Sequence, residues 1–323
     1  MADWQIEEGI GEHRAARIVR GRIAEARIEW PGGLAPGHVI EPTLSAKTAG
    51  SSRGTVRADG GEEALVDRLP REASEGAPLR VEVLRAAIGE RGRSKLAHVR
   101  PTNRPLARHT LAERLRSEGR DVKLVRRFLE GDWNELAAEA IEGTTEFAGG
   151  SLIFAPTPGM TVIDIDGTLP ARDLAMAAIA PLADAIRRLD LGGSIGIDFP
   201  TLEAKADRRA VDAALAEALA DWPHERTAMN GFGFVQLVAR LERQSVLHRA
   251  HFQRAAFVAR QLLRRAELVE EPGALLLTCH PAVAGAIAPA WRDELTRRTG
   301  REVRIAEIPT LAPEAAFAQA VAR

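Results

Sequence analysis

The sequence contains no tyrosine and only one cysteine, Cys279, in 323 residues. A single cysteine excludes an internal disulfide and any zinc site built from several thiolates. Lysine is also scarce, and it occurs only at Lys47, Lys95, Lys123 and Lys205. Nearly all basic residues are therefore arginine, which suits bidentate phosphate contacts. We attribute the preference for arginine mainly to genome composition.

Excess charge of one sign and long apolar runs are absent too. The formal net charge is −1, so any basic surface for a nucleic acid must be local. No apolar run approaches the length that crosses a membrane, and the first residues, MADWQIEEGIGEHR, are not typical of a signal peptide. We therefore expect a cytoplasmic protein. An apolar content of 45% supports a packed core in two or three domains.

Two short apolar runs each have an acid at or near their end. They are TVIDID at 161–166 and SIGIDF at 194–199. Such runs, closed by glycine, predict buried strands. Apolar residues at helical spacing over 171–189 predict a helix between them. This crossover makes the two strands parallel neighbours, so Asp164 and Asp198 are expected at the same end of the sheet.

An acid in a buried strand needs a partner. For a single aspartate, a helix cap or an ion pair is the simpler explanation. Two aspartates at equivalent strand positions, Asp164 and Asp198, with Asp166 two residues on, instead suggest a hard cation. Mg²⁺ takes oxygen ligands and is often held by one or two carboxylates. The sequence therefore predicts Asp164 and Asp198 as Mg²⁺ ligands.

The same residues carry a resemblance. The motifs IDIDGT and LDLGGSIGIDF resemble the catalytic stretch of the ribonuclease E/G family, whose usual forms are IDIN-S-x and RDLGGxIxIDF. The following EAKADRRAVDAALAEAL and NGFGFVQLVARLERQSV are similar to the next two segments of that family. The resemblance implies a metal-dependent endoribonuclease that hydrolyses phosphodiester bonds in single-stranded RNA. It implies Asp164, Asp166 and Asp198 as catalytic residues, although the family commonly has Asn where Asp166 stands.

The resemblance also implies an α+β fold of several domains. An OB-fold β-barrel over residues 34–100 would be inserted in an RNase H-like part made of residues 1–33 and 101–147. A DNase I-like α/β catalytic part over 148–245 and a small α/β C-terminal domain over 246–323 would follow. In the RNase H-like part, the N-terminal strands expected over 3–7, 14–20 and 23–30 would join a later segment.

Residues 34–100 read as strands over 35–44, 54–58, 63–69 and 79–85, which fits a five-stranded barrel. OB-folds hold single strands by stacking bases on aromatic rings. Residues 34–99 contain no Phe, Trp or Tyr, and Thr55 and Leu65 stand at the family's two aromatic positions. We therefore expect weaker RNA binding by this part.

The remaining candidates for RNA binding are basic. Arg91, Arg93 and Lys95 lie in a glycine-containing hairpin, for which a solvated turn is the alternative. Arg208 and Arg209 lie on the helix expected after Asp198 and could reach a phosphate, although at least one is expected to be a surface charge.

Residues 101–146 read as three helices. Thr110 is a predicted N-cap with Glu113 as its capping-box partner, and two further helices are expected over 121–129 and 132–142. The resembled family normally carries a subdomain here that senses the 5′ monophosphate of RNA. The segment is too short to contain one, so we expect this sensor to be missing.

Residues 246–323 are expected to alternate helix, strand, helix, strand and helix, with strands over 274–278 and 302–308 and an amphipathic segment over 281–299. His248, His251 and His280 with Cys279 suggest a zinc site. We favour satisfied or exposed histidines, because the Cys-x-x-Cys of the family's zinc link is absent. We therefore expect no zinc and a monomer or dimer.

Two other function classes stay open. A catalytically inactive RNA-binding or regulatory protein derived from this family would explain the missing aromatics and Asp166, which adds a third negative charge where Asn adds none. That charge could tighten metal binding or recruit a second ion. A sugar or phosphate hydrolase is less well supported, because the chain has no nucleophile elbow, Walker loop or convincing dinucleotide loop.

Overall fold

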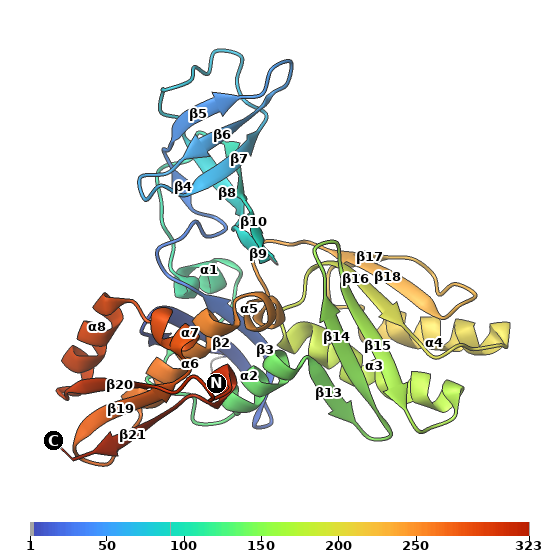
Figure 1. Cartoon of the computed structure of the whole chain (residues 1–323). Coiled ribbons are helices and arrows are strands. Elements are labelled where there is room, and N and C mark those ends of the chain that lie inside the picture. Colours follow the sequence, from blue (N-terminus) through green and yellow to red (C-terminus); the bar gives the residue numbers. More distant parts are fainter. Residues whose placement is uncertain (1–2, 91, 323) are drawn as a thin grey trace.

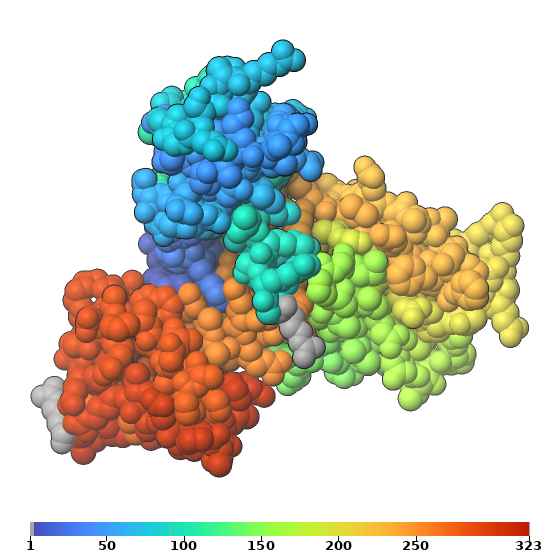
Figure 2. Space-filling view, turned by 45° about the horizontal axis from the view of Figure 1, so that its top comes forward, coloured from blue at the N-terminus to red at the C-terminus, as the bar shows by residue number. Residues whose placement is uncertain are grey.

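The computed structural model describes residues 3–90 and 92–322 as a mixed α+β fold, as the sequence predicts (Figure 1). The strands described there form five sheets. In the space-filling view the chain divides into three lobes that meet near the centre (Figure 2). Among the described residues, no helix has both the length and the apolar character needed to cross a membrane.

The first sheet joins the N-terminus to a later segment. It has the order β12-β1-β2-β3, and its strands are β1 (Trp4–Gly9), β2 (Glu12–Val19), β3 (Arg22–Glu29) and β12 (Val122–Leu124). The pairing of β12 with β1 is parallel, and the others are antiparallel. The expectation that the N-terminal strands join a later segment is confirmed. Helices α1 (Leu111–Ser117) and α2 (Trp133–Glu142) flank β12 in the chain.

The predicted helix over 121–129 is therefore wrong. Val122–Leu124 pairs with β1, which would otherwise be an unpaired sheet edge, and the backbone bonds from Trp4 N to Asp121 O and from Val125 N to Ile6 O extend the pairing. The other two helices are confirmed, and so is the predicted cap of the first one. Thr110 and Glu113 form the predicted capping box, and the Asp132 carboxylate accepts the first backbone N–H groups of α2.

The second sheet is curled, with the order β4-β8-β11-β7-β6-β5. We call it the curled sheet. Its strands are β4 (Val39–Ile40), β5 (Thr43–Lys47), β6 (Arg53–Arg57), β7 (Glu63–Asp67), β8 (Val81–Arg85) and β11 (Ala97–Pro101). The strand expected over 35–44 is instead two strands, β4 and β5, on opposite edges. A separate hairpin of β9 (Ile88–Glu90) and β10 (Arg93–Lys95) projects from its base (Figure 1).

The third sheet carries the candidate site. Its order is β13-β14-β15-β16-β18-β17, with β13 (Thr144–Phe147), β14 (Gly150–Pro156), β15 (Thr161–Gly167), β16 (Gly193–Asp198), β17 (His224–Arg226) and β18 (Phe234–Ala239). Only the β15–β16 pairing is parallel. Helix α3 (Ala171–Arg188) connects these two strands, as predicted, and α4 (Lys205–Ala218) follows β16 and packs against α3.

The C-terminal part begins with α5 (Val246–Phe252) and α6 (Arg254–Glu267), which lead to a sheet of β20 (Val303–Glu307), β19 (Ala274–Cys279) and β21 (Phe317–Val321). The segment 281–299 is two helices, α7 (Pro281–Gly285) and α8 (Pro289–Thr299), because Pro289 takes the first position of a new helix. The last element is also not the expected helix. After the short 3₁₀ turn η1 (Pro313–Ala315), β21 pairs with the edge of β19.

Buried charged groups fasten the C-terminal part to the first sheet. On β2, the Glu12 carboxylate accepts from Arg14 Nε at 2.6 Å, from Gln261 Nε2 of α6 at 3.2 Å and from Trp30 Nε1 at 2.9 Å. On β1, the Glu7 carboxylate accepts from Arg264 Nε of α6 at 3.0 Å. Because these groups are buried and bonded on several sides, they fix the two lobes relative to one another.

Replacing Glu12 with Gln should destabilise the protein by about 3–5 kcal/mol, because Arg14 then stays buried without its counter-charge. Urea unfolding measures this. The control is Glu25→Gln on the neighbouring β3, which removes the partly exposed Arg17–Glu25 pair and should cost less than about 1 kcal/mol. Equal costs for the two variants would contradict the role assigned to the buried pair.

Candidate active site

Asp164 and Asp198 are direct partners across the parallel pairing of β15 and β16. Partners of this kind point to the same face of a sheet. Asp198 is the last residue of β16, whereas β15 continues past Asp164 to Gly167 because it also pairs with β14. The two aspartates therefore lie side by side, as predicted, but only Asp198 is at a strand end. We call them the aspartate pair.

The strands are buried on one face only. Ile163 and Ile165 of β15, like Ile195 and Ile197 of β16, are buried in the cluster that includes α3, while the aspartate pair and Asp166 are exposed. We call the face with these acids, opposite α3, the open face. The prediction of strands buried on both faces is wrong at these positions, so the acids do not carry the desolvation cost that it assumed.

The aspartate pair has no counter-charge. Within residues 3–90 and 92–322, neither carboxylate has an ion-pair or hydrogen-bond partner. Neither caps a helix, since α3 and α4 have no side-chain cap. Like charges directly opposite one another in a sheet repel. The two explanations for a single aspartate, a cap or an ion pair, therefore do not apply to this pair.

Asp166 lies on the same face, two residues along β15, and its partner on β14 is Ser151. Its Oδ1 accepts from the backbone N–H of Gly167 at 2.8 Å. The described residues contain no group of three or more His, Cys, Asp or Glu side chains that could together hold a metal ion. Two adjacent carboxylates open to solvent nevertheless fit Mg²⁺, which keeps several waters and binds through one or two carboxylates plus substrate phosphates.

Apolar residues lie on both sides of the aspartate pair. The cross-strand partner of Asp164 on β14 is Ile153, which is 40% exposed, and the partner of Asp198 on β18 is Phe234. The Phe234 ring covers Gly196, where an added Cβ would lie 2.5 Å from a ring carbon. Glycine at 196 thus lets an aromatic ring lie on the open face beside Asp198.

The turn before β18 contains residues that the sequence analysis did not identify. Strand β18 begins at Phe234, and Phe232 is 83% exposed in the turn before it. Asn230 Oδ1 accepts from the N–H groups of Phe232 at 2.9 Å and Phe234 at 3.1 Å. The Asn-Gly at 230–231 predicts such a turn, and this signal could have located Phe232 outside the strand.

The two arginines of α4 that could bind a phosphate, Arg208 and Arg209, differ in whether the structure already occupies their side chains. Arg208 donates to the backbone oxygens of Leu202 and Glu203, so it closes the start of α4. Arg209 is exposed on the same helix. The structure therefore leaves Arg209, rather than Arg208, accessible to a ligand.

The hairpin of β9 and β10 is not a freely solvated turn. Arg93 and Lys95 both bind the buried Glu90 carboxylate, each at 2.7 Å, and Lys95 Nζ also donates to Pro158 O at 3.0 Å, just before β15. The negative charge of Glu90 offsets the charge of these two side chains, and the hydrogen bond from Lys95 lowers the pKa of Glu90. Figure 2 shows the cyan-green surface at the base of the curled sheet against the green surface of the third sheet. Arg91 lies outside the described residues.

On the curled sheet, Thr55 and Leu65 are cross-strand partners on β6 and β7, and Leu65 is 45% exposed. The two positions therefore share one outer face. That face also carries His98, whose ring binds Asp67 Oδ2 at 2.7 Å. The structure brings the two positions together, but no Phe, Trp or Tyr lies there.

The histidines considered for zinc have other roles. His248 Nδ1 lies 2.6 Å from Ser245 Oγ, and burial lowers its pKa to about 4. His280 Nδ1 accepts from the backbone of Ala282 as the cap of α7. Cys279 is buried, and burial raises its pKa. For His248 and His280, the prediction of satisfied side chains is confirmed.

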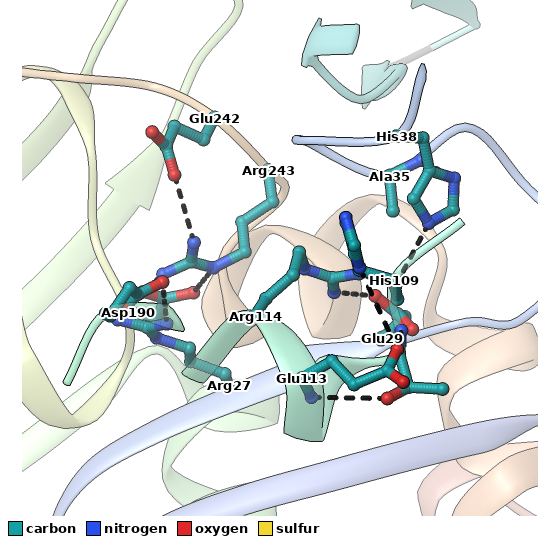
Figure 3. Close-up of polar contacts among 12 residues, drawn as sticks. Arg27, Glu29, Ala35, His38, His109, Glu113, Arg114, Asp190, Glu242 and Arg243 are labelled. Carbon is teal, nitrogen blue, oxygen red and sulfur yellow. Dashed lines mark hydrogen bonds and ion pairs between the residues drawn. The ribbon is translucent and has the colours of Figure 1, made fainter. Parts of the chain in front are cut away.

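A cavity of about 540 Å³ lies away from the aspartate pair, where the first sheet, the curled sheet and α5 meet. Two of its arginines, Arg114 and Arg243, are in ion pairs with acids from other parts of the chain. Arg114 donates to the Glu29 carboxylate and to His109 O. Arg243 donates to both carboxylate oxygens of Asp190 (Figure 3). Burial, with the nearby charges of Arg243 and Arg27, lowers the pKa of Arg114 to about 10, so it stays charged at neutral pH. This cluster holds three parts of the chain together.

A scan against models of known protein families gives no match for this chain, and a search of curated proteins finds none that is similar to it. The candidate site therefore stands on its own geometry.

If the aspartate pair is uncompensated, Asp164→Asn or Asp198→Asn should each stabilise the metal-free protein by about 0.2–1 kcal/mol, because either change removes the same repulsion. The double variant should gain little more than one single variant. Urea unfolding of the four proteins at low and high salt measures this, and the gain should shrink as salt screens the charges.

Asp173→Asn is the matched control for this cycle. Asp173 lies in the first turn of α3, where a negative charge is favourable, so its neutralisation should destabilise the protein by about 0.3–1 kcal/mol. Loss of stability in Asp164→Asn and Asp198→Asn as well would show that the pair has favourable partners, contrary to the structure.

Proposed function

We propose that this protein is a metal-dependent endoribonuclease that hydrolyses phosphodiester bonds in single-stranded RNA. The observation that carries the proposal is the aspartate pair, which lies in register on adjacent parallel strands, exposed and without a counter-charge among the described residues. The motifs around it, IDIDGT and LDLGGSIGIDF, resemble the catalytic stretch of the ribonuclease E/G family. The geometry and the resemblance point to the same two residues.

In this proposal Asp164 and Asp198 hold one Mg²⁺, which when bound neutralises charge on the phosphate and supplies an activated water. The carboxylates fix the metal on the open face, where no helix end or ion pair competes for their oxygens. Asp166 adds negative charge next to the pair and has one oxygen free of the Gly167 bond. Arg209, and Arg93 and Lys95 beside Pro158, would contact the RNA backbone.

The same proposal covers the parts of the chain. The curled sheet at 34–100 would be an OB-fold, residues 1–33 with 101–147 an RNase H-like part, and 148–245 a DNase I-like part. The curled sheet and the pairing of β12 with β1 support this division. We further propose a cytoplasmic enzyme, a monomer or dimer, that uses Mg²⁺ and contains no zinc.

A catalytically inactive RNA-binding protein is the second candidate. It is favoured by the absence of aromatic rings at Thr55 and Leu65 and by the presence of Asp166 where the family commonly has Asn. The two candidates differ in whether purified protein cleaves RNA in a Mg²⁺-dependent way.

With a mixed RNA substrate and Mg²⁺, Asp164→Asn and Asp198→Asn should each lower the cleavage rate by roughly 100-fold or more, because a charged metal ligand is lost. Excess Mg²⁺ should partly restore activity. Asp184→Asn is the matched control, since Asp184 is an exposed acid on α3, on the helix side of the sheet. It should leave the rate unchanged.

Asp166→Asn restores the family's residue and should retain activity. A wild-type protein that binds RNA without cleaving it, combined with an active Asp166→Asn variant, would favour the inactive candidate. Cleavage that persists unchanged in both Asp164→Asn and Asp198→Asn would refute the proposed site.

The enzyme should not distinguish RNA with a 5′ monophosphate from RNA with a 5′ hydroxyl. Residues 101–146 are occupied by α1, β12 and α2, and the nearby arginines Arg114 and Arg243 are already paired with carboxylates. Cleavage of one RNA prepared with each 5′ end measures this. A large rate difference would mean that a sensor exists elsewhere in the chain.

A further inference from the structure

Phe232 is the most exposed of the large apolar residues in the described chain, and it lies in the turn before β18, the strand that pairs with β16 at Asp198. Its side chain is 83% exposed, whereas Phe234, two residues later, lies on the open face as the partner of Asp198. A phenylalanine held in water forgoes the free energy of burying its ring. An aromatic residue kept exposed beside a candidate site therefore suggests a ligand that covers it.

The backbone under Phe232 is fixed by several contacts. Asn230 Oδ1 accepts two backbone N–H groups of the turn, and Gly233 N donates to Asn230 O at 3.3 Å. Gly233 has a φ of 90°, and an added Cβ would lie 2.6 Å from Phe199 O, so only glycine fits. The turn therefore presents Phe232 in a defined position.

The same turn is bonded to the strand that carries Asp198. The N–H of Phe199, the residue after Asp198, donates to Gly233 O at 3.2 Å. Phe232 therefore directly precedes Gly233, the residue that is hydrogen-bonded to the end of β16. A group that stacked on its ring would lie within a nucleotide or two of a phosphate bound at the aspartate pair.

We propose that Phe232 is a base-stacking residue, which receives the base of a nucleotide next to the phosphate that is cleaved. The proposal rests on the function proposed above. Stacking on an aromatic ring is the usual way in which proteins hold single-stranded nucleic acids without reading their sequence. The curled sheet contains no Phe, Trp or Tyr, so Phe232 would supply this interaction at the aspartate pair instead.

The test measures binding and cleavage with a short fluorescent RNA. In the Asp198→Asn background, which prevents turnover, Phe232→Ala should weaken binding by about 5- to 150-fold, as loss of one stacked base predicts. Phe232→Trp should bind within about 2-fold of the parent, because it keeps a stacking face, and Phe232→Leu should resemble Phe232→Ala. Melting temperatures should not change, since the side chain is exposed.

Phe317→Ala is the matched control, because Phe317 is 41% exposed on β21 in the C-terminal sheet, in a different lobe. It should not affect binding. A series of RNAs is then prepared, each lacking the base at one position. At one position, loss of the base should weaken binding by the parent protein but should not weaken binding by Phe232→Ala. That position identifies the stacked base.

The outcomes separate this inference from the proposed function. If the wild type cleaves RNA in a manner that requires Asp198, but Phe232→Ala binds and cleaves like the wild type, the stacking role is wrong and the nuclease proposal stands. If the wild type neither binds nor cleaves RNA, both are wrong. Equal losses in Phe232→Trp and Phe232→Ala would also overturn the stacking role.

Discussion

The parallel pairing of β15 with β16 is the constraint on which the candidate site depends. Its register places Asp164 directly opposite Asp198, and α3 supplies the crossover that makes the strands parallel. A shift of one residue would place one of the two acids on the buried face among isoleucines such as Ile163. The core that buries these isoleucines therefore keeps two repelling charges side by side. The rest of the sheet stabilises this unfavourable arrangement, which is common at functional sites.

The placement of the curled sheet beside the third sheet depends on a second set of interactions, made by residues 242–244. Arg243 binds Asp190, just after α3 (Figure 3), and the neighbouring Glu242 O accepts from Ala86 N, just after β8 of the curled sheet. Gln244 then donates to Gly89 O of the β9–β10 hairpin. Consecutive residues after β18 thus join the curled sheet to the third sheet. The pairs are buried or partly buried, so truncating one partner leaves a charge that the interior solvates poorly.

The sequence predicts local structure well and long-range pairing less well. The strand–helix–strand unit and the Thr110 capping box both follow from spacing along the local sequence, and each is confirmed. The strand Val122–Leu124 was missed because it is short, and its pairing with β1 joins residues far apart in the chain. The ion pairs of Glu90 with Arg93 and Lys95 were missed because a run of charged residues in the sequence does not show which side chain is buried. The prediction that the acids lie in a buried strand is wrong because apolar and acidic residues alternate from Ile163 to Asp166, and such alternation is typical of a strand with one face exposed.

The position of Asp166 bears on what a third acid can do at this site. Residues two apart on a strand are separated by about 6.6 Å along it, and Asp166 Oδ1 is already bonded to Gly167 N. A metal ion between Asp164 and Asp198 would therefore be held by the pair, with Asp166 acting through its charge. At that separation, on an exposed face, the effect is moderate and is screened by salt. Exchange of Asn for Asp at this position would thus change the electric field at such a metal ion more than the number of its ligands.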